Sequence, residues 1–363
     1  MKRLTDICDI QYGYAFDSKC FTEDSSYPQL VRIRDVKRGY SETYYSGDYP
    51  EEYILSEGDL LVGMDGEFNI ARWKCSGALL NQRVCKLTAK VGTNEEYIRL
   101  AMLKSLKEIE QRTAFVTVKH LSAKELNKLE LDIPELTKQD KIADTLSRLE
   151  RVIEARKEEL EKLDELIKAR FVEMFGDEKN SKDWTIVHIE DVADVQVGVV
   201  IKPSQYYTDE NNGIRAFRSL NVGEGFIKDS DWVYFTIEGH RKNSKSILKE
   251  NDLLIVRSGA PGTACVVNKD YVGCNAIDII IVHPDCEKVN PYYLCTFTNM
   301  PHGKKQIVKG TGGAAQQHFN VGKYNKMHLM LPPKELQDEF VKFLEQVNKS
   351  KVVVFNPIYY YNK

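Results

Sequence analysis

One stretch of the chain, residues 139–175, limits the possible folds more than any other feature. Alternating steps of four and three residues along it meet an apolar side chain at seven of nine positions: Ile142, Leu146, Leu149, Ile153, Arg156, Leu160, Leu163, Ile167 and Arg170. This ladder is typical of a coiled-coil seam. Pro134 before it and Gly176 after it are typical helix-boundary residues, so the pattern predicts one helix roughly 55 Å long.

A helix of that length exceeds the width of a small domain. We therefore expect it to stand out as a strut with a partner along its apolar stripe. The alternative is a solvent-covered surface helix within one large domain. The sequence on either side of the stretch favours the strut.

Length and composition describe a two-domain globular protein. The chain has 363 residues, of which 42% are hydrophobic and 29% charged, and no apolar run approaches a membrane span or a signal peptide. We therefore expect a soluble, cytoplasmic protein. The eight cysteines contain no Cys-x-x-Cys pair, which argues against a zinc site and predicts reduced thiols. With a formal net charge of −3, any nucleic-acid binding would depend on local patches.

Three segments of the first half of the chain recur in the second half in the same order. The pairs are residues 4–13 and 189–198, 54–62 and 247–255, and 120–146 and 318–344, at offsets of 185, 193 and 198. An offset that grows along the chain predicts a duplicated unit whose second copy took insertions. The order is then domain, helix, domain, helix.

Each copy mixes short strands with single helices, which predicts an α+β domain with a curved mixed sheet. In the first copy we expect strands near residues 29–36, 60–64, 82–87 and 129–133, and a helix near 95–111. In the second copy we expect strands near 214–217, 253–257, 277–282 and 328–331, and a helix near 291–300. The fold class is thus two duplicated α+β domains joined by a long coiled-coil helix, with a second, shorter helix at the C-terminus.

This layout resembles the specificity subunit of type I restriction-modification systems, in which two target-recognition domains are separated by a central helix and followed by a C-terminal one. The resemblance covers about residues 1–350 and rests on Asp6-Ile-Cys-Asp-Ile-Gln-Tyr-Gly13, Gly58-Asp-Leu-Leu-Val-Gly-Met-Asp-Gly66 and Ile133-Pro-x-Leu-x-x-Gln139-x-x-Ile142-Ala143. It implies that each domain reads one half of a split DNA target. It also implies that an antiparallel helix pair sets the distance between the halves and that methyltransferase subunits dock around these helices.

The resemblance implies domain boundaries, partners and cofactors. The boundaries are target-recognition domain 1 over residues 1–136, a central coiled-coil helix over 137–177, target-recognition domain 2 over 178–333, a short C-terminal helix over 334–350 and an irregular tail over 351–363. The implied partners are double-stranded DNA, methyltransferase (modification) subunits and a restriction/translocase subunit. The chain itself would be non-catalytic and without a cofactor, whereas its partners would use S-adenosylmethionine, ATP and Mg. The implied subunit-interface residues are Ile142, Leu146, Leu149, Ile153, Leu160, Leu163, Ile167, Phe340 and Leu344.

By the family's general layout, loops and strand edges of each domain would enter the major groove while basic and amide groups hold phosphates. The candidates in the first copy are Tyr12, Tyr14, Arg32, Arg34, Asp65, Glu67, Asn69, Lys119 and His120. Those in the second copy are Lys202, Arg215, Arg218, Arg257, Ser258, Thr311, Gln316, Gln317 and His318.

Some of these candidates have a more specific expected role. Arg32 and Arg34 lie two positions apart and would share one face of a strand. Gln316 and Gln317 could read adenine edges, and Arg257 could read guanine. Each candidate also has a plainer alternative, namely a solvated arginine pair, an ordinary turn or a core tyrosine.

Patterns for catalysis are incomplete. The chain has no Gly-x-x-x-x-Gly-Lys-Ser/Thr loop for a nucleotide. Asp65 and Glu67 could bind a metal as in a nuclease, but no Lys follows at the usual short spacing. The seven histidines are dispersed and none is spaced as a metal pair, so we expect no metal site.

The second helical ladder departs from the family's pattern. It continues through Phe340, Leu344 and Val347 to about Lys349, roughly 20 Å, before Val352-Val-Val-Phe-Asn-Pro357 interrupts it. A full-length antiparallel partner for the first helix would then be missing, leaving most of its seam uncovered. Either the stripe pairs with another copy or a methyltransferase subunit, or the chain is a truncated, inactive specificity subunit.

The predicted function is sequence-specific DNA recognition that directs adenine methylation and restriction by partner subunits. The two half-sites should lie about one helical turn apart on one face of the duplex. The alternative from another class is a protein-interaction scaffold with duplicated head domains on a coiled coil.

Overall fold

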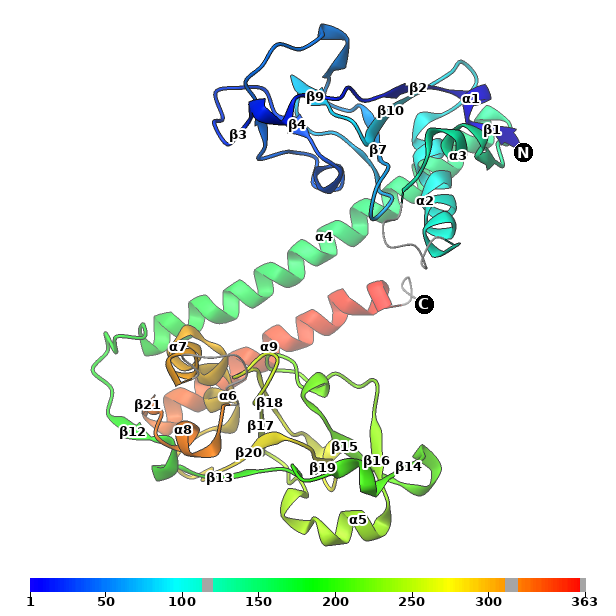
Figure 1. Ribbon diagram of the computed structural model, residues 1–363. Coiled ribbons are helices and arrows are strands. Elements are labelled where there is room, and N and C mark those ends of the chain that lie inside the picture. Colours follow the sequence, from blue (N-terminus) through cyan, green and yellow to red (C-terminus); the bar gives the residue numbers. More distant parts are fainter. Residues whose placement is uncertain (113–119, 311–318, 360–363) are drawn as a thin grey trace. The chain divides into compact units, whose positions relative to one another are not determined.

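The computed structural model of the chain describes residues 1–112, 120–310 and 319–359 and divides into two compact units, Met1–Glu154 and Ala155–Lys363 (Figure 1). The first unit contains β1 (Lys2–Arg3), α1 (Leu4–Ile7), β2 (Cys8–Tyr12), β3 (Phe21–Thr22), β4 (Leu30–Val31), β5 (Tyr44–Tyr45), β6 (Ile54–Leu55), β7 (Leu60–Gly63), β8 (Ile70–Arg72), β9 (Ala78–Leu80), β10 (Val84–Ala89), α2 (Glu95–Arg112), α3 (Ala123–Lys128) and β11 (Glu130–Leu131). Helix α4 (Leu136–Phe175) begins in the first unit and ends in the second.

The second unit repeats this order with longer connections. Its elements are β12 (Ile186–His188), β13 (Ala193–Val197), β14 (Tyr207–Thr208), β15 (Ile214–Phe217), β16 (Val233–Phe235), α5 (Ile237–Lys242), β17 (Leu253–Val256), β18 (Ala264–Val266), β19 (Asn275–Ala276), β20 (Ile279–Pro284), α6 (Pro291–Asn299), α7 (Pro301–Gly310), α8 (Val321–Asn325), β21 (His328–Met330) and α9 (Lys334–Tyr359).

Sheet topology confirms the predicted duplication. The main sheet is antiparallel with strand order β2-β10-β7-β8 in the first unit and β13-β20-β17-β18 in the second. The parallel pair β4 and β9 corresponds to the parallel pair β15 and β19, and the outer pair β1 and β11 corresponds to β12 and β21. Each unit is therefore one copy of the same α+β domain.

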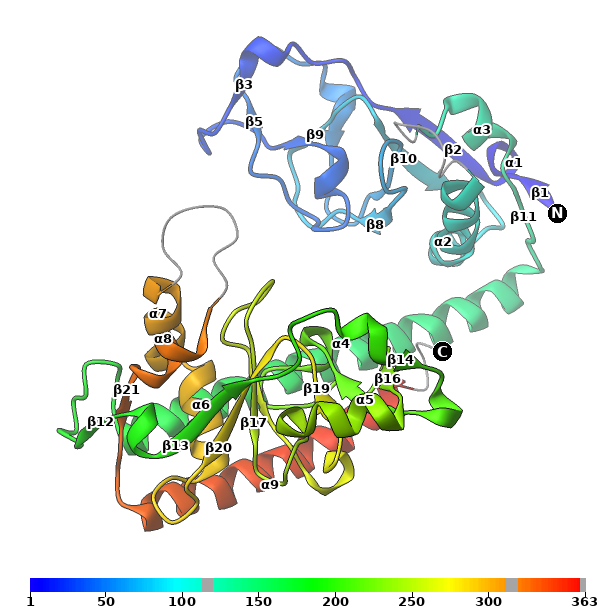
Figure 2. The ribbon, with the colours of Figure 1, turned by 60° about the horizontal axis from the view of Figure 1, so that its bottom comes forward.

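The main sheet of the second unit is buried on both faces (Figure 2). Leu253 and Ile255 of β17 pack with α6 and the long helices, whereas Leu254 and Val256 face β15 and β19. Successive side chains of a strand point to opposite faces, so burial on both sides explains why β17 is apolar at every position. The first unit is built in the same way, with Leu60 facing α2 and Leu61 facing β4 and β9.

A buried glutamine holds the beginning of each long helix. The Gln139 side chain is 1% exposed; its Oε1 accepts a hydrogen bond from Asn94 N (2.9 Å), and its Nε2 donates to Pro134 O (2.8 Å). Gln337 in the second unit is fully buried and makes the same two bonds, with Asn290 N (2.8 Å) and Pro332 O (2.8 Å).

The Asn side chain completes this arrangement in both copies, because Nδ2 of Asn94 donates to Asp140 and Nδ2 of Asn290 donates to Asp338, both at 2.7 Å. We call this set of bonds the glutamine clasp. It joins three segments in each unit: the turn before the domain helix, the proline segment that follows the last strand, and the first turn of the long helix.

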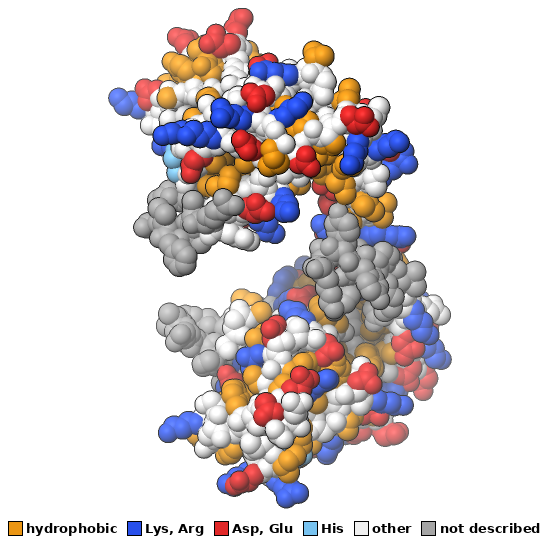
Figure 3. All heavy atoms as spheres, turned by 90° about the vertical axis from the view of Figure 1, so that its right-hand side faces the viewer, with side chains coloured by type: hydrophobic (Ala, Val, Ile, Leu, Met, Phe, Trp, Pro, Cys, Tyr) orange, Lys and Arg blue, Asp and Glu red, His pale blue; other side chains and the backbone are white. Residues whose placement is uncertain are grey.

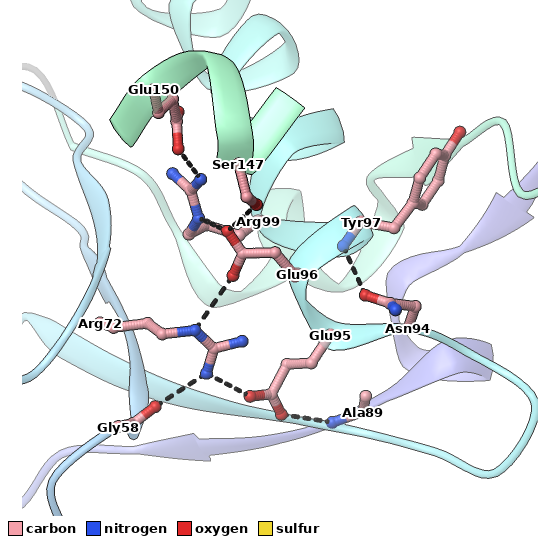
Figure 4. A network of polar contacts seen from close by, with 10 residues as sticks. All are labelled: Gly58, Arg72, Ala89, Asn94, Glu95, Glu96, Tyr97, Arg99, Ser147 and Glu150. Atoms are coloured by element: carbon pink, nitrogen blue, oxygen red, sulfur yellow. Dashed lines mark hydrogen bonds and ion pairs between the residues drawn. The ribbon is translucent and has the colours of Figure 1, made fainter. Parts of the chain in front are cut away.

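A second, charged contact ties the first domain to α4. Figure 4 shows Arg72 of β8 between the carboxylates of Glu95 and Glu96, at 2.9 and 3.0 Å. Arg99 of α2 pairs with Glu96 at 2.7 Å and with Glu150 of α4. Burial would raise the pKa of Glu96, but the hydrogen bonds and charges of Arg99 and Arg72 outweigh it and hold this pKa below its ordinary value of 4.5.

The C-terminal part of α4 is covered by α9. Ion pairs Arg170–Glu339 (3.3 Å) and Asp164–Lys351 (2.5 Å) show that the two helices run antiparallel. Between them lies an aromatic cluster in which Phe171, Phe175 and Phe340 are fully buried. Gly176 ends α4 in the left-handed conformation (φ +86°), as the sequence predicted.

Three expectations need correction, and the first two concern a strand and a helix. The predicted strand over residues 29–36 ends after Val31, because the buried Asp35 side chain accepts from Arg32 N (3.0 Å) and closes a 3₁₀ turn over Ile33–Asp35. Helix α9 runs 26 residues to Tyr359 and does not stop near residue 350, since β-branched residues lower helix propensity by only a few tenths of a kcal/mol each. It is still shorter than the 40 residues of α4.

The third correction concerns the predicted subunit interface. Ile167, Phe340 and Leu344 are at most 9% exposed within the chain's own core, so they are not available to a partner. Toward the N-terminus of α4 the apolar stripe is more exposed to solvent. Leu149 is 39% exposed, and the partly exposed residues are Ile142, Leu146, Ile153, Leu160 and Leu163. For this open part, a subunit contact stays a prediction.

Replacing Glu96 by Gln removes the charge that two arginines share. We expect the free energy of unfolding of the first domain to fall by about 1–3 kcal/mol at neutral pH. The folded pKa of Glu96 is lowered, so its stabilisation is full above 4.5 and is lost as the pH falls through the lowered pKa. The difference between variant and parent should therefore shrink on acidification in urea titrations. Glu159→Gln, in an exposed pair with Arg156, is the matched control; a Glu96→Gln effect that does not change with pH contradicts this account.

Candidate nucleic-acid interface

A groove in the first domain collects several of the predicted DNA-contacting residues. It has a volume of about 400 Å³ and is lined by Phe16, Ser18, Phe21, Arg32, Ile33, Arg34, Asn81, Gln82 and Arg83. Arg32 and Arg34 reach it from the 3₁₀ turn after β4, and the last three residues form the turn between β9 and β10. Guanidinium and carboxamide groups are the side chains best suited to reading base edges.

A glycine lets the loop after β2 cross close to the β9–β10 turn. A Cβ on Gly13 would lie 2.0 Å from the carbonyl oxygen of Asn81, so only glycine fits there. Gly13 N donates to Val84 O (3.0 Å), and Tyr14 bonds through its backbone to Leu80 and Gln82. Gly198 makes the same approach to Ala276 in the second domain, at 2.2 Å.

The two predicted tyrosines of this loop have different surroundings. The Tyr12 hydroxyl donates to Asn127 Oδ1 of α3 (2.7 Å), and burial raises its pKa to about 12. Tyr14 is 42% exposed and lies against the rings of Phe16 and Tyr53, with centroids 5.1 and 5.2 Å away. Tyr14 can therefore touch a ligand beside the groove, whereas Tyr12 is held by the domain itself.

Asp65 and His120, both predicted, meet at the rim of the groove together with Arg83, which the sequence analysis did not single out. Asp65 and His120 form an isolated β-bridge, and His120 Nδ1 contacts the Asp65 carboxylate. Arg83 Nε lies 3.5 Å from Asp65 Oδ2, and its Nη1 lies 3.2 Å from His120 Nδ1. Glu67 and Asn69 lie in the neighbouring exposed loop, where Asn69 Nδ2 donates to Glu67 O (3.2 Å).

In the second domain the predicted Arg257 is largely engaged. Its side chain is 15% exposed, its Nη1 contacts Asp278 Oδ1 (2.5 Å) and its Nε donates to Phe319 O (3.2 Å). Reading guanine with this fork would require breaking both contacts. Ser258 follows it in the exposed loop after β17.

The other described candidates of the second domain are more open. Arg215 lies over the ring of Trp232 (5.6 Å) and near Asp229 (3.9 Å). Arg218 donates to the Asp231 carbonyl, and Lys202 is exposed with a left-handed φ of +43°. The predicted residues Lys119, Thr311, Gln316, Gln317 and His318 lie outside the described residues.

Charge on the surface is mixed. On the face shown in Figure 3, lysine and arginine side chains lie among acidic and apolar ones and do not gather into one continuous patch. Within residues 1–112, 120–310 and 319–359 no group of three or more His, Cys, Asp or Glu is placed to hold a metal ion. In the described part of the chain, no helix is long and apolar enough to cross a membrane.

Comparisons with known proteins agree on one family. The family described as "Type I restriction modification DNA specificity domain" matches residues 1–165 and again residues 181–352. The specificity subunit of the type I restriction enzyme EcoBI from Escherichia coli is 28% identical over 369 residues, which cover 95% of this chain and 78% of that protein.

Solved structures share the fold. The S subunit of the type I restriction-modification system of M. genitalium matches with a TM-score of 0.62 at 13% identity, covering 98% of this chain and 91% of that one. A chain from a structure titled for the complex assembly and conformational transition of the type I R-M system matches with a TM-score of 0.52 at 18% identity, with the same coverage.

Substitutions of the two loop tyrosines should separate ligand contact from folding. Tyr14→Ala is expected to weaken DNA binding roughly tenfold with little change in stability, because its exposed ring lies beside the groove. Tyr12→Phe should lower stability by about 1 kcal/mol through the lost bond to Asn127 and leave DNA affinity unchanged. Fluorescence anisotropy measures DNA affinity, and thermal unfolding measures stability. If Tyr12→Phe weakened DNA binding and Tyr14→Ala did not, Tyr12 and not Tyr14 would be the tyrosine that contacts DNA.

Proposed function

We propose that this chain, which belongs to the type I restriction modification DNA specificity domain family, recognises a split DNA target. Each domain would read one half-site. The chain thereby directs adenine methylation and restriction by partner subunits. The observation that carries the proposal is the duplicated domain. Two copies with the same strand order each begin a long helix from the same glutamine clasp.

The groove of the first domain supports the proposal. Arg32 and Arg34 supply cationic donors, and the exposed Gln82 belongs to a residue type that pairs with adenine edges. Asn81 is 7% exposed and its Oδ1 accepts from Gln82 N (2.9 Å), so it holds the turn. Because the whole chain carries a net charge of −3, attraction to phosphates must come from such local groups. In the second domain, Arg215, Arg218 and Lys202 are the described residues best placed for that role.

We propose that the chain is not itself an enzyme and that chemistry is left to its partners. Burial raises the pKa of Cys8, Cys85 and Cys265 to about 12, so these thiols stay protonated at neutral pH and are poor nucleophiles. The partners would be methyltransferase subunits that use S-adenosylmethionine and a restriction subunit that uses ATP and Mg. The assembly would act in the cytoplasm, where its DNA lies.

The open apolar stripe of α4 supports a partner contact. Leu149 of the stripe is 39% exposed, and its neighbours Leu146 and Ile153 are partly exposed, on a helix whose other surface is mostly charged. Exposed apolar residues at coiled-coil spacing are typical of a helix that binds another helix. We assign this stripe to the methyltransferase subunits, or to a second copy of the chain.

Deleting the gene should remove methyl-adenine from one split motif in the host genome. Single-molecule sequencing of the host with and without the gene measures this directly. Complementation with the intact gene is the control and should restore the motif. If the chain is expressed intact and its deletion changes no methylated motif, then it does not direct methylation.

Binding of the complex to its target should weaken steeply as salt rises. Each neutralised phosphate contributes a slope of about −0.9 in log K against log salt, so several contacts in each domain lower affinity roughly a thousandfold between about 50 and 200 mM. Filter binding over this range tests the expectation. A protein-interaction scaffold would show no DNA affinity to lose.

A further inference from the structure

Arg83 occupies an unusual backbone conformation at the rim of the first-domain groove. Its φ is +72°, in the left-handed region that residues other than glycine rarely adopt. The conformation is held by hydrogen bonds on both sides: Met64 N donates to Arg83 O (2.8 Å), and Gln82 N donates to Tyr14 O (2.7 Å). A residue held in such a conformation at a site is a candidate for a functional role.

The side chain of Arg83 is also held, but only on one side. Asp65 contacts Nε and His120 contacts Nη1, so the guanidinium is oriented before any ligand arrives. Half of the side chain (51%) remains exposed. Nη1 and Nη2 each carry two N–H groups, and the contact with His120 occupies one of those on Nη1. One N–H of Nη1 and those of Nη2 remain as donors of the kind that match guanine O6 and N7.

The second domain has a shorter turn at this place, with two residues between β19 and β20 and three between β9 and β10, and its last residue carries the opposite charge. Asp278 lies at the equivalent position between β19 and β20, also left-handed (φ +49°), and pairs with Arg257. An aspartate cannot donate to guanine, and Arg257 is occupied by this pair. The residue that precedes β10 or β20 is thus left-handed in both copies, while its side chain differs.

We propose that Arg83 reads a guanine in the half-site of the first domain through a bidentate contact, with Asp65 and His120 as positioning residues. The inference rests on the proposed function and deepens it by naming the residue and the base. It also assigns the exposed end of the β9–β10 turn, Gln82 and Arg83, as a base-reading element of this domain.

The test uses the full chain in complex with its modification subunits and the split target found by genome sequencing. Each guanine–cytosine pair of both half-sites is replaced singly by adenine–thymine, and affinity is measured for the parent, Arg83→Lys and Arg83→Asn. Lysine keeps the charge but loses the fork, and asparagine tolerates the left-handed conformation. Arg148→Ala, which removes an exposed ion pair with Asp144, is the control.

For the parent complex, one guanine of one half-site should be worth about 10- to 100-fold in affinity. Both Arg83 variants should bind the native target weaker by a similar factor and be insensitive to that one replacement, while Arg148→Ala behaves like the parent. If both variants weaken every duplex equally, Arg83 holds a phosphate and the inference is wrong. If both Arg83 variants keep all of the parent's base preferences, the inference is wrong as well, but the proposed function survives. A parent complex without any sequence preference would instead refute the proposed function.

Discussion

The direction in which each long helix leaves its domain depends on one buried glutamine side chain. Gln139 and Gln337 each bond a backbone N–H before the domain helix and the carbonyl of a proline, groups that are partly or fully buried. Leaving such a group unpaired costs about 1–3 kcal/mol, so the clasp has few low-energy alternatives. The position of the groove relative to the first turns of α4 follows from it, because the same bonds join the domain helix, the departing strand and the long helix.

The two copies keep this clasp but hold their long helices by different forces. In the first domain Arg72, Glu96 and Arg99 bridge β8, α2 and α4 through ion pairs. In the second domain, Phe340 of α9 and Tyr293 of α6 both pack against the aromatic residues at the end of α4. Charged contacts demand precise geometry and lose strength when one partner is neutralised, whereas apolar packing is insensitive to pH. The second junction also has the ion pairs Arg170–Glu339 and Asp164–Lys351, but its aromatic core makes it the less sensitive of the two to pH.

Patterns that extend over many residues were predictable from the sequence. Places where one side chain decides between a strand and a turn were not. The heptad ladder and the three repeated segments predicted the long helix and the duplicated domain, because each rests on many positions at once. The strand predicted through Arg32 and Arg34 failed because one buried aspartate, Asp35, offers the backbone a turn. Arg83 was missed since no spacing rule marks an arginine in a left-handed turn; comparison with Asp278 through the repeat was the available signal.

In the β9–β10 turn, the backbone conformation and the identity of the exposed side chain depend on different contacts. Its backbone is set by contacts that do not involve the exposed side chain: Gly13 packs against Asn81, and the Arg83 carbonyl accepts from Met64. Gly198 and Ala276 make the corresponding contact in the second domain, beside Asp278. Arginine in one copy and aspartate in the other thus both occupy a left-handed residue just before the strand, in turns that differ in length by one residue. A scaffold that separates backbone geometry from side-chain identity in this way can change the base it reads without changing its fold.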